Sequence, residues 1–207
     1  MSRRLRLKQI SRIAILLACA ALALCSNFAQ AQKVDLAFGV SGLTAPSADS
    51  ASGDHQPASL SGGTYPGFSG DVLFWHNLGI GGEIFWRATQ ADSYQQTPGL
   101  NFRPVFFDFD AVYSPKLATH TYLDLDGGIG AISNRFYCSG CGNGYNTNYT
   151  SDKHFMVDVG GGIKFYVKGG FFVRPEARLY YATNNNLFSS GRFARAGLSI
   201  GYTFGGH

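Results

Sequence analysis

Residues His154–Ala182 read HFMVDVGGGIKFYVKGGFFVRPEARLYYA, two runs that meet at the pair Gly169-Gly170. In both runs the odd-numbered positions are apolar, apart from one glycine and one proline in the middle of the runs. The even-numbered positions include histidine, aspartate, lysine, arginine and glutamate. A period of two places the apolar side chains on one face of a β-strand and the polar ones on the other. Two such runs joined by Gly-Gly indicate a β-hairpin.

The same alternation continues through most of the chain and predicts eight strands. They are 10 to 15 residues long, whereas strands in globular proteins usually have about 5 or 6 residues. Strands that cross a membrane at a tilt need about 9–11 residues, so these lengths favour a membrane barrel. The predicted strands are Val34–Thr44, Gly67–His76, Ile80–Thr89, Phe102–Tyr113, Thr119–Ser133, His154–Lys168, Phe171–Ala182 and Phe193–Phe204.

The connections between these strands are long and short in turn, which places every long connection at one end of the sheet. Short periplasmic turns and longer external loops are typical of outer-membrane barrels. We therefore predict an all-β fold, an eight-stranded antiparallel up-and-down transmembrane β-barrel formed by residues 32–207. The long connections are Ala45–Pro66, Gln90–Asn101, Asn134–Lys153 and Thr183–Arg192, and the short ones are Asn77–Gly79, Ser114–Ala118 and Gly169-Gly170.

The composition supports this fold class. Among 207 residues there are 27 glycines and 14% aromatic residues, which suit strands joined by tight turns, and only 14% are charged. Disordered chains are charged and poor in aromatics, so a disordered protein is excluded. Five of the 17 basic residues lie before position 13, which leaves 12 basic and 13 acidic residues in 32–207. That balance lacks the basic surplus of a nucleic-acid-binding protein.

The N-terminus has the pattern of an export signal. Residues 1–12 are basic, Ile13–Leu24 is an apolar run, and Ala29-Gln30-Ala31 fits a cleavage site between small residues. We predict a signal peptide over residues 1–31 and a mature chain that starts at Gln32. The alternatives are a transmembrane anchor, which needs about 20 apolar residues, and a lipid-modified cysteine within the leader.

Two cysteines remain after the leader, Cys138 and Cys141, in the spacing C-S-G-C. In an exported protein such a pair most often forms a small disulfide, so we predict a disulfide in the loop Asn134–Lys153. Free thiols, a redox pair and a metal site are the alternatives. A zinc site would require a second cysteine pair or two histidines at ligand spacing, and neither follows.

The polar face of the strands carries most of the charge, and in a barrel this face lines the lumen. Opposite charges on one face can supply each other's partners, so we interpret them as a paired polar plug. A narrow gated path for ions or small solutes through the same residues is the alternative. The predicted lumen charge network is Arg87, Asp108, Asp110, Asp124, Asp126, Asp158, Lys164, Arg174, Glu176, Arg178 and Arg195.

With its export signal, eight alternating strands and loop asymmetry, the chain resembles the small eight-stranded outer-membrane β-barrel proteins, the group of the OmpA transmembrane domain, OmpX and OmpW-like proteins. The resemblance covers all of residues 32–207. It implies an assembly signal in the last strand, read by the barrel assembly machinery, although Gly205–His207 follow it here. The residues that match this signal are Arg195, Gly197, Ile200, Tyr202 and Phe204.

No functional motif of that group is matched, so the expected role is structural or one of surface interaction, without catalysis. We expect a monomer in contact with outer-membrane lipid, with a surface ligand of unknown identity at the external loops. A narrow channel is the second reading, and a lipid A-modifying enzyme is the third, with Ser151, Asp152 and His154 as its candidate residues. We expect no cofactor, no metal, no nucleotide and no nucleic acid.

Overall fold

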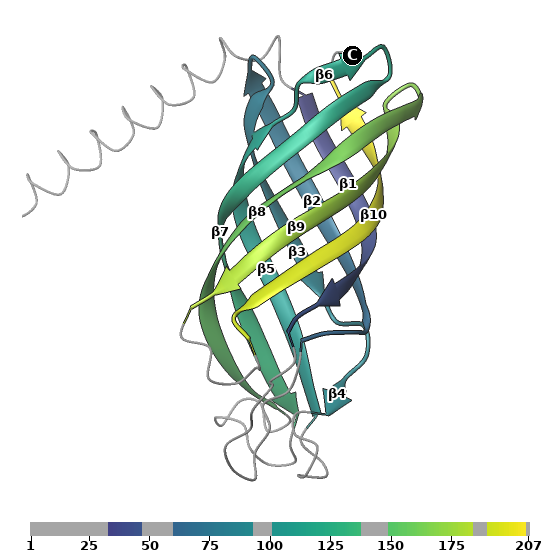
Figure 1. Ribbon diagram of the computed structural model, residues 1–207. Helices are drawn as coiled ribbons and strands as arrows, with labels where there is room; N and C mark the ends of the chain where they lie inside the picture. The colour runs from purple at the N-terminus through teal and green to yellow at the C-terminus, as the bar shows by residue number, and fades with distance from the viewer. Residues whose placement is uncertain (1–32, 47–59, 93–100, 138–148, 184–189, 206–207) are drawn as a thin grey trace, which may run out of the picture.

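The computed structural model is a single antiparallel β-sheet that closes into a barrel (Figure 1). The described residues are 33–46, 60–92, 101–137, 149–183 and 190–205. The eight long strands are β1 (Lys33–Thr44), β2 (Thr64–Trp75), β3 (Leu78–Trp86), β5 (Asn101–Tyr113), β7 (Thr121–Tyr137), β8 (Tyr149–Lys168), β9 (Phe171–Ala182) and β10 (Arg192–Phe204). Two short strands, β4 (Ala91–Asp92) and β6 (Lys116–Ala118), extend the sheet beside β5 and β7.

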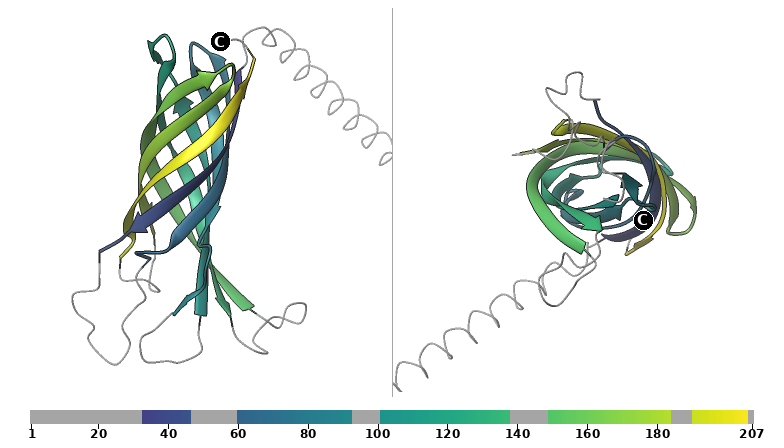
Figure 2. Two further views of the ribbon diagram at one scale, coloured as in Figure 1. Left: turned by 90° about the vertical axis from the view of Figure 1, so that its right-hand side faces the viewer. Right: turned by 90° about the horizontal axis from the view of Figure 1, so that it is seen from below.

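The first and last strands pair with each other and close the barrel. β1 pairs with β2 on one side and with β10 on the other, in a register that runs from Val34 opposite Phe204 to Thr44 opposite Ala194. Each of the other long strands pairs with its neighbours in the chain order, and the view along the axis shows the resulting ring (Figure 2). The prediction of an eight-stranded antiparallel up-and-down barrel is therefore confirmed.

The two ends of the barrel differ. The short connections β2–β3, β5–β7 and β8–β9 lie at one end, together with Lys33 and the last described residue, Gly205, and we call this the short-turn end (Figure 1). The strand ends that flank the long connections lie at the opposite, long-loop end. No helix in the described part of the chain is long and apolar enough to cross a membrane.

The β2–β3 turn lies one residue earlier than the sequence predicts. His76 and Asn77 both have positive φ, 46° and 65°, as in the two-residue hairpin turn whose twist matches that of the flanking strands. Leu78 then pairs with Trp75, so the strand resumes where a turn was expected. A histidine in a left-handed conformation is uncommon, and sequence alone gives little reason to expect it there.

β7 and β8 also extend further than predicted. Their ladder continues from Ser133 opposite Lys153 to Tyr137 opposite Tyr149. This extension contains Asn, Arg, Ser, Asp and Lys, so its side chains on both faces are mostly polar and the alternation that marks a strand is hidden. The backbone nevertheless pairs, and these two strands form the longest hairpin of the barrel.

The outer wall carries a continuous apolar surface. Large apolar side chains project outward from every long strand, among them Phe109 at 72% exposed and Leu179 at 62%. A soluble protein rarely exposes such a surface, whereas lipid would cover it. Most charged side chains of the strands face inward instead, where they are buried, and the exceptions lie near the strand ends. The barrel thus has its apolar residues outside and its polar residues in the lumen, the arrangement of a membrane barrel.

Candidate functional site in the barrel interior

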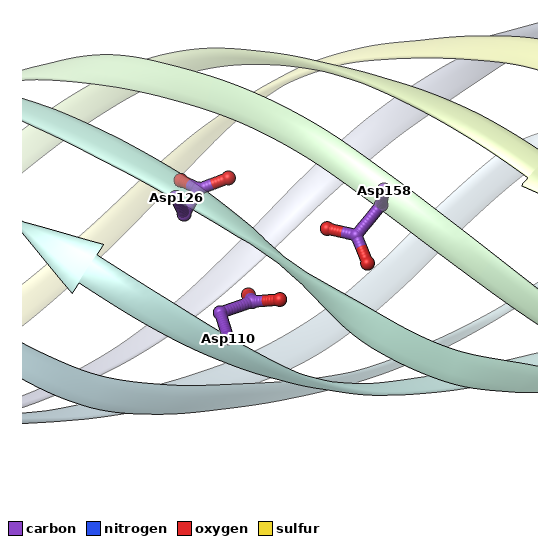
Figure 3. Close-up of side chains that lie close together, drawn as sticks. All are labelled: Asp110, Asp126 and Asp158. Atoms are coloured by element: carbon purple, nitrogen blue, oxygen red, sulfur yellow. The ribbon is translucent and has the colours of Figure 1, made fainter.

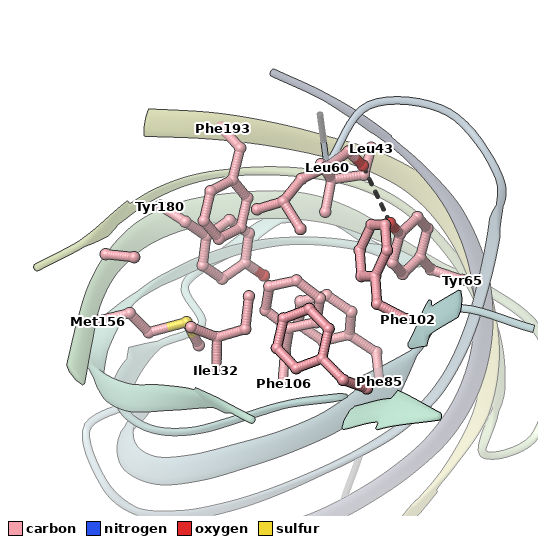
Figure 4. Close-up of a cluster of buried hydrophobic side chains, with 12 residues drawn as sticks. Leu43, Leu60, Tyr65, Phe85, Phe102, Phe106, Ile132, Met156, Tyr180 and Phe193 are labelled. Carbon is pink, nitrogen blue, oxygen red and sulfur yellow. Dashed lines mark hydrogen bonds between the residues drawn. The ribbon is translucent and has the colours of Figure 1, made fainter. Parts of the chain in front are cut away.

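The lumen at the long-loop end is filled by an apolar plug, shown in Figure 4. Phe85 and Phe106 are 0% exposed and stack with ring centroids 4.4 Å apart and an interplanar angle of 4°. The Tyr65 hydroxyl donates a hydrogen bond to the Leu60 carbonyl oxygen at 3.0 Å, which satisfies its polar group. The plug consists of Leu43, Leu60, Tyr65, Phe85, Phe102, Phe106, Ile132, Phe136, Met156, Tyr180, Ala182 and Phe193.

All eight long strands contribute to this plug. Each supplies an inward side chain near its long-loop end, and the tilt and stagger of the strands bring these side chains to one level. Tyr180 of β9 stacks on Phe193 of β10 with centroids 4.9 Å apart. A lumen of eight strands is just wide enough for side chains to fill, so a dozen apolar groups close it.

Below the plug, toward the short-turn end, thirteen charged residues form the lumen network. Every one takes part in at least one ion pair with another member; eleven of them are buried, and Asp126 and Glu176 are partly buried. The carboxylates are Asp35, Asp71, Glu83, Asp108, Asp110, Asp124, Asp126, Asp158 and Glu176, and the cations are Lys164, Arg174, Arg178 and Arg195.

Arg195 joins the network to the plug. Its guanidinium donates to both carboxylate oxygens of Glu83, with Nη2 at 2.7 Å from Oε2, and Nη2 also donates to Glu176 at 3.1 Å. The same guanidinium lies over the ring of Phe85, 4.2 Å from its centroid. A cation over an aromatic face is electrostatically favourable, so Arg195 is satisfied on both sides.

Arg178 is surrounded by carboxylates. Nη1 donates to Asp110 at 2.7 Å and to Asp158 at 3.3 Å, which leaves one guanidinium to compensate several negative charges. Its five carboxylate neighbours are Glu83 at 3.6 Å, Asp108 at 4.0 Å, Asp110 at 2.7 Å, Asp126 at 3.3 Å and Asp158 at 3.3 Å.

Nearer the short-turn end the charges are better matched. The Lys164 ammonium lies between Asp35, to which it donates a hydrogen bond, and Asp124 at 3.0 Å. Arg174 contacts Asp124 at 3.4 Å and Glu176 at 2.9 Å. The hydroxyl of Ser114 donates a further hydrogen bond to Asp124 at 2.5 Å. Lys164, Arg174 and Asp124 therefore each have more than one partner.

The structure brings ten of the eleven residues named from the sequence into the lumen network. Arg87 lies elsewhere: it makes no ion pair with a described carboxylate, and its guanidinium lies 5.9 Å from the Phe102 centroid, at the long-loop end. The sequence reasoning missed Asp35, Asp71 and Glu83. They are the acidic residues of the first three predicted strands, where the same period of two would have placed them on the inner face.

Three aspartates near Arg178 have an arrangement that could hold a metal ion, although the sequence predicts no metal. Asp110, Asp126 and Asp158 come from β5, β7 and β8, and one carboxylate oxygen of each lies within 4.8 Å of the other two. Figure 3 shows their carboxylates turned toward a common space. Oxygen-only ligands of this kind suit hard cations.

The three residues considered for catalysis do not assemble. The Nε2 atom of His154 lies 3.5 Å from a carboxylate oxygen of Asp152. Ser151 is an odd number of positions from His154 on the same strand, so it lies on the opposite face of β8, opposite Arg135 of β7. A hydroxyl on the outer face cannot share a proton with a histidine on the inner face.

The remaining predicted residues are placed as follows. Arg195 faces the lumen, while Ile200, Tyr202 and Phe204 are exposed on the outer wall, so the proposed assembly signal stays a prediction from sequence. Cys138 and Cys141 lie outside the described residues, as does the predicted signal peptide over residues 1–31.

Comparison with known proteins agrees with this geometry. The family model for the outer membrane protein β-barrel domain matches residues 15–204. Neisserial surface protein A is similar at a TM-score of 0.57 and 11% identity, covering 84% of this chain and 97% of that one. The N-terminal β-barrel domain of OprF from Pseudomonas aeruginosa is similar at 0.51 and 14%, covering 84% and 98%.

Another similar structure is that of Ail, the attachment invasion locus protein of Yersinia pestis, in complex with the heparin analogue sucrose octasulfate. Its TM-score is 0.50 and its identity 12%, with coverage of 84% of this chain and 99% of that one. At such identities the likeness extends to the fold alone. The comparison with curated protein sequences returns no match.

Proposed function

The chain belongs to the outer membrane protein β-barrel family, and we propose that it acts there as a closed, non-conducting barrel whose long-loop end makes contacts at the cell surface. The observation that carries this proposal is the apolar plug. A lumen that conducts would keep a water-filled path from end to end. Here the stacked and fully buried rings of Phe85 and Phe106 lie across the lumen.

The plug opposes ion passage for two physical reasons. An ion that crosses it would lose its hydration shell among apolar groups, which is very costly for a charge. A hydrophobic constriction also expels water, and dewetting alone can close a pore. Directly beneath Phe85, the Arg195 guanidinium is paired with Glu83.

The surface role is supported by a basic patch on the outer wall at the long-loop end. Arg103 of β5 lies directly opposite Arg135 of β7, and Lys153 of β8 lies nearby, opposite Ser133. Like charges placed opposite each other are destabilising unless an anion compensates them. None of the three forms an ion pair with a carboxylate in the described part of the chain.

Aromatic rings accompany these cations. Arg103 lies over the ring of Tyr137, and Arg135 over that of Tyr149, with distances to the centroids of 5.9 and 5.3 Å. Basic and aromatic side chains at the rim of a membrane barrel meet the lipid headgroups. We place the phosphate-bearing headgroups of the outer leaflet against this patch.

Conductance in a planar bilayer tests the closed lumen. The refolded protein should show a heat-dependent gel shift, which reports a formed barrel, and no discrete current steps. The variant Phe85→Ala/Phe106→Ala should give reproducible steps, because it removes the stacked pair that closes the lumen. Steps from the unmodified barrel would overturn the proposal in favour of a channel.

Binding of lipid tests the surface contact. Lipopolysaccharide should stabilise the unmodified barrel more than phosphatidylcholine does, and this extra stabilisation should be smaller in Arg103→Gln/Arg135→Gln. The gap between the unmodified protein and the variant should shrink as salt is raised. Lys116→Gln is a matched control, since Lys116 is exposed at the short-turn end. Equal responses of the double variant and the unmodified protein would remove the patch from the proposal.

A further inference from the structure

We propose that Asp110, Asp126 and Asp158 bind one hard divalent cation, of the calcium class, in the middle of the lumen. The three carboxylates come from three different strands, and one oxygen of each lies within 4.8 Å of the other two, as Figure 3 shows. The inference rests on the interior of the barrel alone. It does not depend on whether the barrel conducts or contacts lipid.

The first argument is local charge. Glu83 is already compensated by two hydrogen bonds from Arg195. Arg178 then faces four aspartates with a single positive charge, all within 4.0 Å of its guanidinium. Burying unpaired carboxylates is costly, so a bound cation would stabilise this part of the lumen.

The second argument is a set of oxygens without partners. Asp108 is 2% exposed, and neither of its carboxylate oxygens has a hydrogen-bond partner among the described residues. Its Oδ2 points toward the same guanidinium nitrogen that contacts Asp110 and Asp158, so it is directed into the cluster. Buried polar groups are almost always paired, and a cation bound beside Asp108 would supply the partner that its oxygens lack.

The aspartates of the cluster also keep oxygens free for a ligand. Arg178 takes Oδ2 of Asp110 and Oδ1 of Asp158. The other oxygen of each, Oδ1 of Asp110 and Oδ2 of Asp158, is buried and has no hydrogen-bond partner in the described structure. The guanidinium thus takes one oxygen of each of these two aspartates and leaves the other for a second cation.

The ligand type selects the cation. All the candidate ligands are carboxylate oxygens, which suit calcium, magnesium or manganese rather than zinc or copper. Calcium accepts six to eight oxygens in variable geometry, whereas magnesium demands a near-ideal octahedron. Carboxylates fixed to three strands of a rigid sheet are better matched to the more tolerant ion.

Access to the site is restricted on both sides. The apolar plug lies toward the long-loop end, and Arg174 and Lys164, with their carboxylates, lie toward the short-turn end. A cation would therefore enter as the barrel closes and exchange slowly afterwards. The protein should accordingly be refolded with calcium present or with a chelator, rather than titrated after folding.

The test is calcium binding by the refolded full-length barrel. Protein refolded with radiolabelled calcium should retain one ion more than the variant Asp110→Asn/Asp158→Asn after gel filtration. The matched control is Asp71→Asn, which also replaces a buried lumen aspartate but lies on Arg174 instead of Arg178. The control should retain the same number of ions as the unmodified protein.

Thermal stability supplies a readout that does not depend on counting ions. Calcium during refolding should raise the melting temperature of the unmodified barrel and of Asp71→Asn, and leave Asp110→Asn/Asp158→Asn unchanged. Without calcium that double variant should be the more stable form, because it removes like-charge repulsion. Equal calcium retention by all three proteins, or no calcium effect on an unmodified barrel that shows the gel shift, would overturn the site.

Discussion

The guanidinium of Arg195 on β10 holds the carboxylate of Glu83 on β3 through two parallel hydrogen bonds across the lumen, although 112 positions separate them in the chain. β1 and β2 lie between these two strands in the barrel wall. A bidentate pair has a defined geometry. This contact therefore fixes the position of β3 relative to β10 directly, in addition to the strand pairing that connects them through β2 and β1.

Removing one member of this pair should destabilise the barrel strongly. Arg195→Met leaves Glu83 buried without its main partner, and loss of one partner of a buried pair costs about 3–5 kcal/mol. Urea unfolding of the barrel refolded in lipid vesicles measures this, with the fluorescence of Trp75 and Trp86 as the signal. The double variant Arg195→Met/Glu83→Met should lose less than Arg195→Met alone, because no charge is stranded. Losses that simply add would mean that the two residues act independently.

Glycines of the inner face should be intolerant of a side chain where a lumen arginine packs on them. A Cβ at Gly160 would overlap Cγ of Arg178 and lie 2.8 Å from a carboxylate oxygen of Asp126. Gly160→Ala should therefore cost about 1–3 kcal/mol in the same unfolding measurement.

Gly42→Ala is the control for that substitution. Gly42 also lies in a long strand, but a Cβ there would meet no atom within 4 Å. It should leave the free energy of unfolding nearly unchanged. A similar loss for both variants would point to glycine conformation rather than to packing on Arg178.

The sequence was sufficient to predict the eight strands and the closure into an up-and-down barrel. Alternation with a period of two survives in every strand, because one face meets lipid and the other meets the lumen. β9 has the predicted bounds, Phe171–Ala182. The ends of β7 and β8 were misjudged because, beyond the membrane, neither face needs to be apolar.

The apolar plug could not be predicted in the same way. Phe102, Met156 and Phe193 are apolar residues at inward positions, and from sequence each only weakens the alternation of its own strand. That they meet at one level depends on the stagger of all eight strands, which no single strand encodes. The crowding of four aspartates around Arg178 has the same origin.

Substitutions on the outer wall of the barrel should have costs that depend on their depth in the membrane. Val159 of β8 is 59% exposed and lies opposite Leu179 of β9, which is 62% exposed. Val159→Arg should cost about 2–4 kcal/mol in a bilayer, since a cation at mid-depth on the outer wall faces hydrocarbon. Ser151→Arg, on the same face of β8 but at the long-loop end, should cost about 0–1 kcal/mol. Equal costs at both positions would contradict the placement of the membrane around the middle of the barrel.

The balance of charge in the lumen bears on what would pass if the plug were opened. The lumen network has nine carboxylates and four cationic side chains. Rings of carboxylates favour cations in a pore, because they lower the electrostatic energy of a cation and raise that of an anion. The excess of carboxylates belongs to the lumen network, so it remains when plug residues are shortened.

The opened variant Phe85→Ala/Phe106→Ala should therefore conduct cations in preference to anions. The measurement is the reversal potential across a potassium chloride gradient, which should shift toward the potassium equilibrium potential. Adding Asp108→Asn to the opened variant should reduce the shift, because Asp108 is a buried carboxylate immediately below the plug residue Phe106 on β5. Adding Lys116→Gln, a change outside the lumen network, should leave it unaltered. A reversal potential near zero or shifted toward chloride would show that the carboxylates are neutralised in the open lumen, by protons or by a bound cation, and that the acidic excess does not govern permeation.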